Sequence, residues 1–390
     1  MPEGGQAPPL TAAQRRWSLA AAIAAVAVFG IGIGFAAPLF SLLLEARGTE
    51  SSLTGLNAAV AYVGVIVGPL WTPRLVRRFG IRGFLLGCFA ADVVLFLAMK
   101  LFDGLGAWFV LRLLLGMVGS SVFTASEAWI NLLAGDENRG RVLGFYTASL
   151  AAGFAAGPLL LALTGTAGWT PFLAGAAVTA LAALPLLGVG GLSRDFAREP
   201  GGSALAIFAK APFIVLAVAL YGVFEATGFA LLPIWGVRSG LTPTTAAALL
   251  TAIGVGAIAL QLPIGVLSDK MARLTVLRLC ALAGLAGAAL MPFAATAGGV
   301  TLFAAVLLWG GVASGIYPVA LAMAGARFRG AELVTANAAL IVAYGLGSLA
   351  GPTLGGIAMD LWNPHGLIAT FALLFAAFFA LTVGWRRATP

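Results

Sequence analysis

The feature that most constrains this sequence is the regular return of apolar runs about 20 residues long. A helix needs about 20 apolar residues to cross the roughly 30 Å hydrocarbon core of a bilayer. Such runs recur along the whole 390-residue chain and are separated by short clusters of Arg, Asp, Gly and Pro. They predict twelve membrane-spanning helices, centred near residues 31, 63, 92, 121, 151, 179, 224, 255, 285, 312, 345 and 375.

Composition favours an all-α membrane protein and excludes several other classes. Hydrophobic residues make up 61% of the chain and charged residues 9%. The long Ala, Leu and Gly runs lack the ten-residue alternation of a membrane barrel. Both cysteines lie inside predicted spans and the chain has one histidine, so we expect no disulfide framework and no metal site. The sequence contains no P-loop pattern for ATP, and we expect neither a cofactor nor enzymatic activity.

The basic residues predict how the spans are oriented. If both termini are inside, eighteen of the 22 Lys and Arg residues fall on the cytoplasmic side. Only Arg47, Lys100 and Arg238 fall outside, and Arg112 lies within a span. Because Lys and Arg concentrate in cytoplasmic loops, we expect a multi-pass protein of the cell inner membrane with both termini in the cytoplasm. The net charge of +8 then reflects topology and contact with membrane lipids, and requires no nucleic acid.

The start of the chain has two interpretations. A basic pair, Arg15-Arg16, precedes the first apolar run, as it would in a secretory signal peptide. The run is longer than the apolar core of a signal peptide and rich in Ala throughout. We therefore favour an uncleaved first span.

The longest polar interruption between spans divides the chain into two halves that resemble each other. At an offset of about 194 residues, Pro38 aligns with Pro233, and Gly157-Pro158 aligns with Gly351-Pro352. Parallel repeats of six spans, related by an axis along the membrane normal, occur in one large class of transporters. The predicted organisation is a cytoplasmic tail (1–16), a six-helix bundle (17–190), a cytoplasmic linker (191–210), a second six-helix bundle (211–386) and a tail (387–390).

A loop motif in the second half resembles the signature of the major facilitator superfamily. Residues 265–273 fit its pattern G-x-x-x-D-[RK]-x-G-[RK], with Ala272 where Gly is usual. In the first half the same loop carries Arg in place of the acid. The resemblance implies a cytoplasmic gate, formed by Gly265, Asp269, Lys270, Arg273, Arg77 and Arg78.

A further element, in the fifth span, carries the same resemblance. The fifth span matches the pattern G-x8-G-x3-G-P associated with antiporters, although Leu161 and Ala162 replace its trailing glycines. Gly and Pro at these positions permit close helix contact and bending. The expected helix-packing residues are Gly144, Gly153, Gly157, Pro158, Gly347, Gly351 and Pro352.

A closer resemblance covers nearly the whole chain. Segments 126–146, 261–279 and 315–352 are similar to the YcaD-type branch of the superfamily. The resemblance implies twelve transmembrane helices in two six-helix halves related by pseudo-two-fold symmetry. It also implies a secondary transporter that works by alternating access, and it says little about the substrate.

Two carboxylates inside predicted spans are candidates for proton coupling. Charge inside a bilayer is costly and usually functional. Glu225 lies near the middle of the span at 215–235, and Glu127 lies nine residues before Asp136, about 13 Å along a helix. Because burial disfavours the charged form of a carboxylate, such groups suit proton exchange. The alternative is a structural acid satisfied by its neighbours, which we expect for Asp92.

Polar and aromatic residues accompany these acids. Ser120, Phe123 and Asn131 share one face of the fourth span with Glu127. Taken singly, most polar residues in spans are helix-packing groups. The expected substrate cavity comprises Arg112, Ser120, Phe123, Asn131, Tyr221, Gln261, Tyr317, Asn337 and Tyr344.

Together these features predict a monomeric, proton-coupled antiporter that exports a small apolar or amphipathic compound. The few fixed charges expected at the cavity disfavour a polyanionic substrate. A proton-coupled symporter that imports a small metabolite is the second hypothesis. A membrane sensor or assembly partner with a transporter fold, which carries no flux, is the third, because the first loop motif is degraded.

Overall fold

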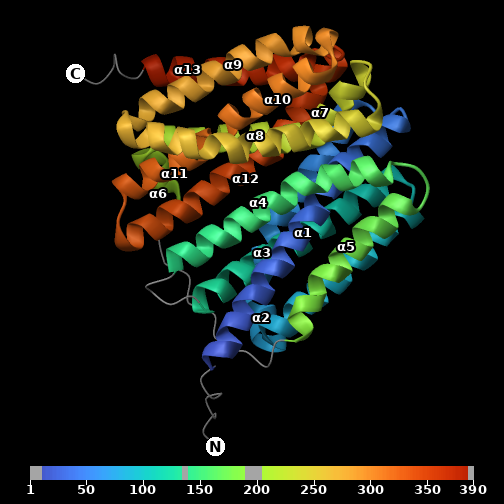
Figure 1. Ribbon diagram of the computed structural model, residues 1–390, viewed down its shortest axis with the longest axis vertical. Helices are drawn as coiled ribbons and strands as arrows, with labels where there is room; N and C mark the ends of the chain where they lie inside the picture. The colour runs from blue at the N-terminus through green and yellow to red at the C-terminus, as the bar shows by residue number, and fades with distance from the viewer. Residues whose placement is uncertain (1–10, 134–138, 189–203, 385–390) are drawn as a thin grey trace, which may run out of the picture. The chain divides into compact units, whose positions relative to one another are not determined.

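The computed structural model describes residues 11–133, 139–188 and 204–384, and all regular secondary structure in these ranges is helical (Figure 1). The first half contains α1 (Ala12–Ala46), α2 (Ser51–Leu101), α3 (Leu105–Leu133), α4 (Arg139–Thr164) and α5 (Thr170–Leu187). The second half contains α6 (Ala204–Lys210), α7 (Pro212–Arg238), α8 (Pro243–Lys270), α9 (Arg273–Ala297), α10 (Gly299–Ser314), α11 (Ile316–Arg327), α12 (Gly330–Leu361) and α13 (Gly366–Gly384).

These helices provide the twelve predicted membrane crossings. Within the described ranges, ten helical segments are long and apolar enough to cross a membrane, with α2 counted once and α10 and α11 counted together. The 51 residues of α2 are too many for one crossing, and the helix is interrupted at Gly80, whose φ of 71° and ψ of 159° are not helical. Its two parts are therefore two crossings. The apolar segment Ala148–Thr164 of α4 completes the set.

The chain forms two compact units. Unit 1 combines α1 up to Phe35, the stretch Val63–Gly157 and α5. Unit 2 combines Ala36–Tyr62, Pro158–Thr166 and the helices from α6 to α13. The second unit thus includes the end of α1 and the beginning of α2 as well as the second-half helices. Most of the predicted linker lies outside the described residues, and its last part forms α6.

In unit 1, α4 packs closely against α1 at two glycines of the predicted packing set (Figure 1). A Cβ atom at Gly153 would overlap the carbonyl oxygen of Ala27, and one at Gly157 would overlap the backbone of Gly34. Glycine at these positions therefore lets the two backbones touch. Gly144 lies outside the residues whose side chains are described.

In unit 2, α12 and α7 repeat this contact about 194 residues later in the chain. A Cβ atom at Gly347 would overlap the carbonyl oxygen of Ala219, and one at Gly351 would overlap the hydroxyl of Thr227. The internal repeat that the sequence predicts is thus a repeat of the same close helix contact in each half.

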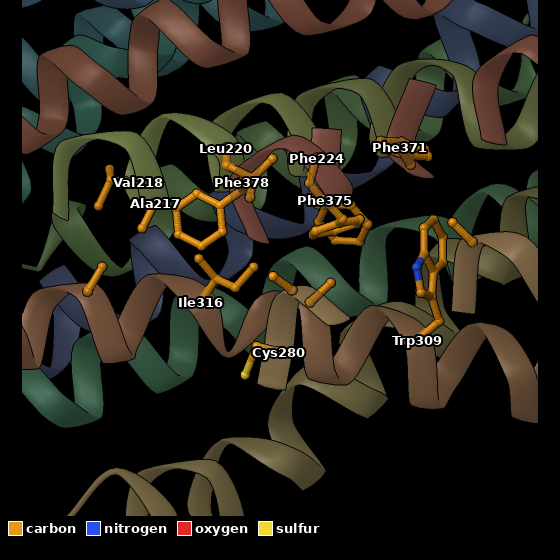
Figure 2. Close-up of a cluster of buried hydrophobic side chains, with 14 of the residues drawn as sticks. Ala217, Val218, Leu220, Phe224, Cys280, Trp309, Ile316, Phe371, Phe375 and Phe378 are labelled. Carbon is orange, nitrogen blue, oxygen red and sulfur yellow. The ribbon is translucent and has the colours of Figure 1, made fainter. Parts of the chain in front are cut away.

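An aromatic core fixes the rotation of α7 in unit 2. Phe224 lies 5.2 Å from the ring of Trp309 and 5.4 Å from the ring of Phe371 (Figure 2). The indole of Trp309 donates to the carbonyl of Gly284 at 2.9 Å. Because successive residues of a helix point about 100° apart, anchoring Phe224 in this core turns Glu225 toward a different side of α7.

Candidate functional site

Glu225 is held by tyrosine hydroxyls from two helices. Tyr221 precedes it by one turn of α7, and its hydroxyl donates to Oε1 at 2.8 Å. The hydroxyl of Tyr344 on α12 donates to Oε2. Gly222 permits this second contact, because a Cβ atom there would overlap the carbonyl oxygen of Tyr344. Both oxygens of the carboxylate are bonded, and the carboxylate links α7 to α12.

Three tyrosine rings cluster where the Glu225 carboxylate is bound. We call Tyr221, Tyr317 and Tyr344 the tyrosine group; they come from α7, α11 and α12. The ring centre of Tyr221 lies 5.0 Å from that of Tyr317 and 6.2 Å from that of Tyr344. The ring centres of Tyr317 and Tyr344 are 6.4 Å apart. Tyr62 of α2 lies within electrostatic range of Tyr221 and Tyr344. Four of the five tyrosines in the chain therefore gather here.

The site is polar, contains one carboxyl group and is partly open. The side chains of Glu225 and of the tyrosine group are neither fully buried nor fully exposed. In the described part of unit 2, every Lys and Arg lies at a helix end or within six residues of one, whereas Glu225 is the middle residue of the 27-residue α7. The ionised carboxylate therefore has no fixed basic partner at its own depth there.

Two predicted cavity residues of unit 2 are not part of this arrangement. Gln261 on α8 and Asn337 on α12 are exposed, and neither bonds to the carboxylate of Glu225. The sequence predicts these two amides and the three tyrosines as lining residues of one cavity. The structure thus brings together the aromatic members of the predicted cavity and leaves these amides outside the cluster.

Unit 1 holds the other predicted cavity residues. Arg112 is buried in α3, and the hydroxyl of Ser120 donates to the carbonyls of Met117 at 3.1 Å and Gly64 at 3.5 Å. Ser120 is therefore used in the contact between α3 and α2. Phe123 packs edge-on against Phe29, with ring centres 5.8 Å apart. The side chain of Asn131 lies outside the described residues.

The two remaining interior acids of unit 1 differ in environment. Glu127 is exposed on α3, and the buried Tyr146 of α4 lies within electrostatic range of it. Asp92 is 7% exposed and accepts a hydrogen bond of 2.9 Å from the hydroxyl of Thr179 on α5. Asp92 thus bonds within its own half, as expected for a structural acid, while Glu127 is accessible.

A second polar cluster joins the ends of four helices in unit 2. Arg238, the last residue of α7, binds Glu45 near the end of α1 through two hydrogen bonds of 2.8 Å. The same guanidinium donates to Asn363 at 3.1 Å. Asp360 near the end of α12 accepts from the backbone N–H groups of Ser51 at 2.9 Å and Ser52 at 2.8 Å. We call Glu45, Arg238, Asn363, Asp360 and the backbone of Ser51 and Ser52 the helix-end clamp.

Comparison with known proteins identifies the family. The family model described as Major Facilitator Superfamily matches residues 21–241 and 213–390. The chain belongs to the major facilitator superfamily. It is therefore a multi-pass membrane protein and a secondary transporter of a small molecule, not an enzyme.

Individual relatives agree with this assignment. The chain is 24% identical over 377 residues to the uncharacterized MFS-type transporter YfkF of Bacillus subtilis, covering 92% of this chain and 93% of the relative. It is 26% identical over 326 residues to the uncharacterized MFS-type transporter YcaD of Shigella flexneri, covering 82% of each. The expected resemblance to the YcaD-type branch is confirmed.

A solved structure shows the same fold. The crystal structure of a mutant of the nucleoside transporter NupG superposes with a TM-score of 0.77, over 96% of this chain and 99% of that one, at 13% identity. At this identity the likeness concerns the fold alone. The predicted all-helical major facilitator fold is confirmed.

The loop that carries the superfamily signature lies at the junction of α8 and α9. Asp269 and Lys270 at the end of α8 are exposed, and no described residue forms an ion pair with either. Arg273 donates to the carbonyl of Ala322 at 3.1 Å. In the first half, Arg77 and Arg78 are also exposed. Gly265 faces open space. The gating role of this loop in the transporter stays a prediction.

The helix-end clamp is not among the predicted site residues, although the sequence contains a signal for it. Glu45 and Arg238 are 193 residues apart, close to the repeat offset of about 194 residues. They thus occupy nearly equivalent positions in the two halves of a major facilitator fold. Opposite charges at such repeat-related helix ends can form an ion pair.

Proposed function

We propose that this transporter is a proton-coupled antiporter that exports a small apolar or amphipathic compound by alternating access, with Glu225 as the proton-carrying group. The observation that supports this most strongly is the bonding of the Glu225 carboxylate to Tyr221 and Tyr344. Glu225 is thirteen residues from each end of α7, about 20 Å at 1.5 Å per residue. Such a depth suits the midplane sites of transporters built from repeats.

The hydrogen bonds explain how a proton can be coupled to helix movement. An ionised carboxylate only accepts, and both tyrosine hydroxyls donate to it. A protonated carboxyl group donates through one of its oxygens, so one of the two bonds has to be rearranged. Because Tyr344 belongs to α12 and Glu225 to α7, protonation of the oxygen bound by Tyr344 changes the link between two helices.

The proposed orientation places both termini in the cytoplasm of an inner-membrane protein, because eighteen basic residues then fall inside and three outside. The ends of α1 and α7 that carry Glu45 and Arg238 are then on the outer side. Glu127, nine residues from Asp136 in the sequence, is closer to the cytoplasmic side. We assign it to the proton path as a tuning group.

The test is transport by purified monomer reconstituted into vesicles, with and without an imposed pH gradient. Glu225→Gln should retain exchange of the compound and lose uphill transport driven by protons. Glu127→Gln should slow transport or shift its pH dependence and keep some coupling. Glu332→Gln is a matched control, because Glu332 is exposed and pairs with Lys210 at 2.6 Å. It should transport normally.

Each other result supports a different hypothesis. Uphill movement of the compound in the same direction as protons would indicate a symporter. Ligand binding without flux would indicate a sensor or assembly partner. Normal uphill transport by Glu225→Gln would contradict the assignment of the coupling proton to this residue.

A further inference from the structure

We propose that the compound carried at Glu225 is an organic cation, an amine or quaternary ammonium group on an apolar body. This inference rests on the proposed antiport function and names the substrate class of the same site. It is supported by the charge of the carboxylate, by the arrangement of its hydrogen-bond donors and by the three aromatic rings beside it.

The hydrogen bonds to Glu225 use the hydroxyl hydrogens of Tyr221 and Tyr344. A tyrosine hydroxyl has one hydrogen to donate, and Tyr221 and Tyr344 give theirs to Glu225. The phenol oxygens then present only lone pairs to anything else that approaches. The carboxylate and these oxygens form a cluster of negative and partly negative atoms. Such a cluster repels an anion and attracts a cation through every one of its members.

The tyrosine rings add a second attraction for a positively charged compound. The faces of aromatic rings carry negative charge, and cages of such rings recognise quaternary ammonium groups. The tyrosine group presents three rings with centres 5.0 to 6.4 Å apart. They come from three different helices and are each partly exposed. An apolar body can lie against the same ring faces, so the site suits a cation that is also amphipathic.

Competition between this cation and a proton provides the coupling. One carboxylate cannot be protonated and also balance the charge of a bound cation. Among the other titratable groups, Tyr221 on α7 and Tyr344 on α12 bond to it. Tyr317 on α11 and Tyr62 on α2 lie within electrostatic range of Tyr221. The acidic and basic residues of the described parts of α8, α9, α11 and α12 lie toward the helix ends. The described α10 and α13 contain no acidic or basic residue. Cation binding should therefore weaken as the pH falls, by up to about tenfold per pH unit for one competing proton.

The experiment uses a cation and its neutral carbon isostere. Benzyltrimethylammonium and neopentylbenzene have nearly the same shape and differ in charge. We expect benzyltrimethylammonium, and not neopentylbenzene, to raise the melting temperature of the purified protein and to release protons into weakly buffered solution. Glu225→Gln should lower the affinity for the cation roughly a hundredfold. Tyr317→Leu should lower it about tenfold, and Tyr317→Phe, which keeps the ring, by less than about threefold.

The outcomes separate this inference from the proposed function. Equal stabilisation by the neutral isostere, or equal effects of Tyr317→Leu and Tyr317→Phe, would overturn the cation site. The same holds if benzyltrimethylammonium, tetramethylammonium and tetraphenylphosphonium all fail to bind folded protein. Cation binding that requires Glu225 but drives no exchange with protons in vesicles would retain the site and overturn the antiport function. Proton-driven export of a neutral compound without cation binding would do the reverse.

Discussion

Arg238 and Glu45 form an ion pair with two parallel hydrogen bonds, Nε to Oε1 and Nη2 to Oε2, each 2.8 Å long. The pair joins the ends of α7 and α1, which belong to different sequence halves and to the same compact unit. Their side chains are only 19% and 18% exposed, so solvent screens them less than a surface pair. This geometry gives the pair both strength and a fixed orientation.

We predict that Arg238→Gln shifts the transporter toward the state in which the ends of α1 and α7 separate. Hydrogen bonds to charged groups contribute about 1.5–3 kcal/mol, so the population should change by about tenfold or more. The measurement is alkylation of a single cysteine introduced on α7 near Ile234, in a background where Cys88 and Cys280 are replaced. The exchange of charges, Glu45→Arg with Arg238→Glu, should restore slow alkylation. Equal alkylation of Arg238→Gln and the parent would contradict this role.

Asp360 should stabilise the beginning of α2. The first N–H groups of a helix lack partners within it, and both carboxylate oxygens of Asp360 accept from Ser51 and Ser52. Removing a side-chain cap costs about 0.5–2 kcal/mol. We expect Asp360→Ala to lower the melting temperature and to speed alkylation of a cysteine at the start of α2. Asp360→Asn, which keeps one acceptor oxygen, should have a smaller effect. Identical behaviour of the two variants would argue against capping.

The contact between α12 and α7 should not tolerate a methyl group. At Gly347 a Cβ atom would overlap the carbonyl oxygen of Ala219, and backbone cannot move aside as a flexible side chain can. We expect Gly347→Ala to destabilise the protein by about 1–3 kcal/mol, seen as a lower melting temperature. Gly325→Ala is the control, because no atom of a described residue would lie within 4 Å of the added methyl. Equal melting temperatures would refute the packing role.

The sequence predicts the parts of the site that depend on the local geometry of one helix. Tyr221 and Glu225 are four residues apart, and helix geometry alone places both on one side of α7. The glycines that recur at an offset of about 194 residues mark the same helix contact in both halves. These features can be predicted from the sequence because each follows from the periodicity of one helix or from the internal repeat.

Other features depend on how distant helices are aligned. The bond from Tyr344 to Glu225 spans 119 residues of sequence, and its formation depends on the rotation and height of α12 against α7. The place of Gln261 in a span predicts that it joins these residues, yet it is exposed on α8. The rotation and height of one helix against another decide whether a polar side chain joins a cluster or faces outward. The sequence alone does not fix this alignment.

The two tyrosines that bond to Glu225 should have unequal effects when their hydroxyls are removed. Tyr221 and Glu225 share α7, so Tyr221→Phe removes a bond within one helix. Tyr344 lies on α12, so Tyr344→Phe removes the hydrogen bond through which the carboxylate links two helices. Since either change deletes one donor to the same carboxylate, their effects on its charge should be similar. We therefore expect both variants to shift the pH dependence of transport in the same direction.

Only Tyr344→Phe should weaken coupling itself, because protonation would no longer change a link between α7 and α12. The measurement is the ratio of uphill transport to exchange in vesicles, which should fall about tenfold in Tyr344→Phe and change little in Tyr221→Phe, taking one lost bond to a charged group as about 1.5 kcal/mol. Equal ratios in the two variants would show that the bond between the helices carries no special part of the coupling. In that case the tyrosines serve only to hold the charge of Glu225.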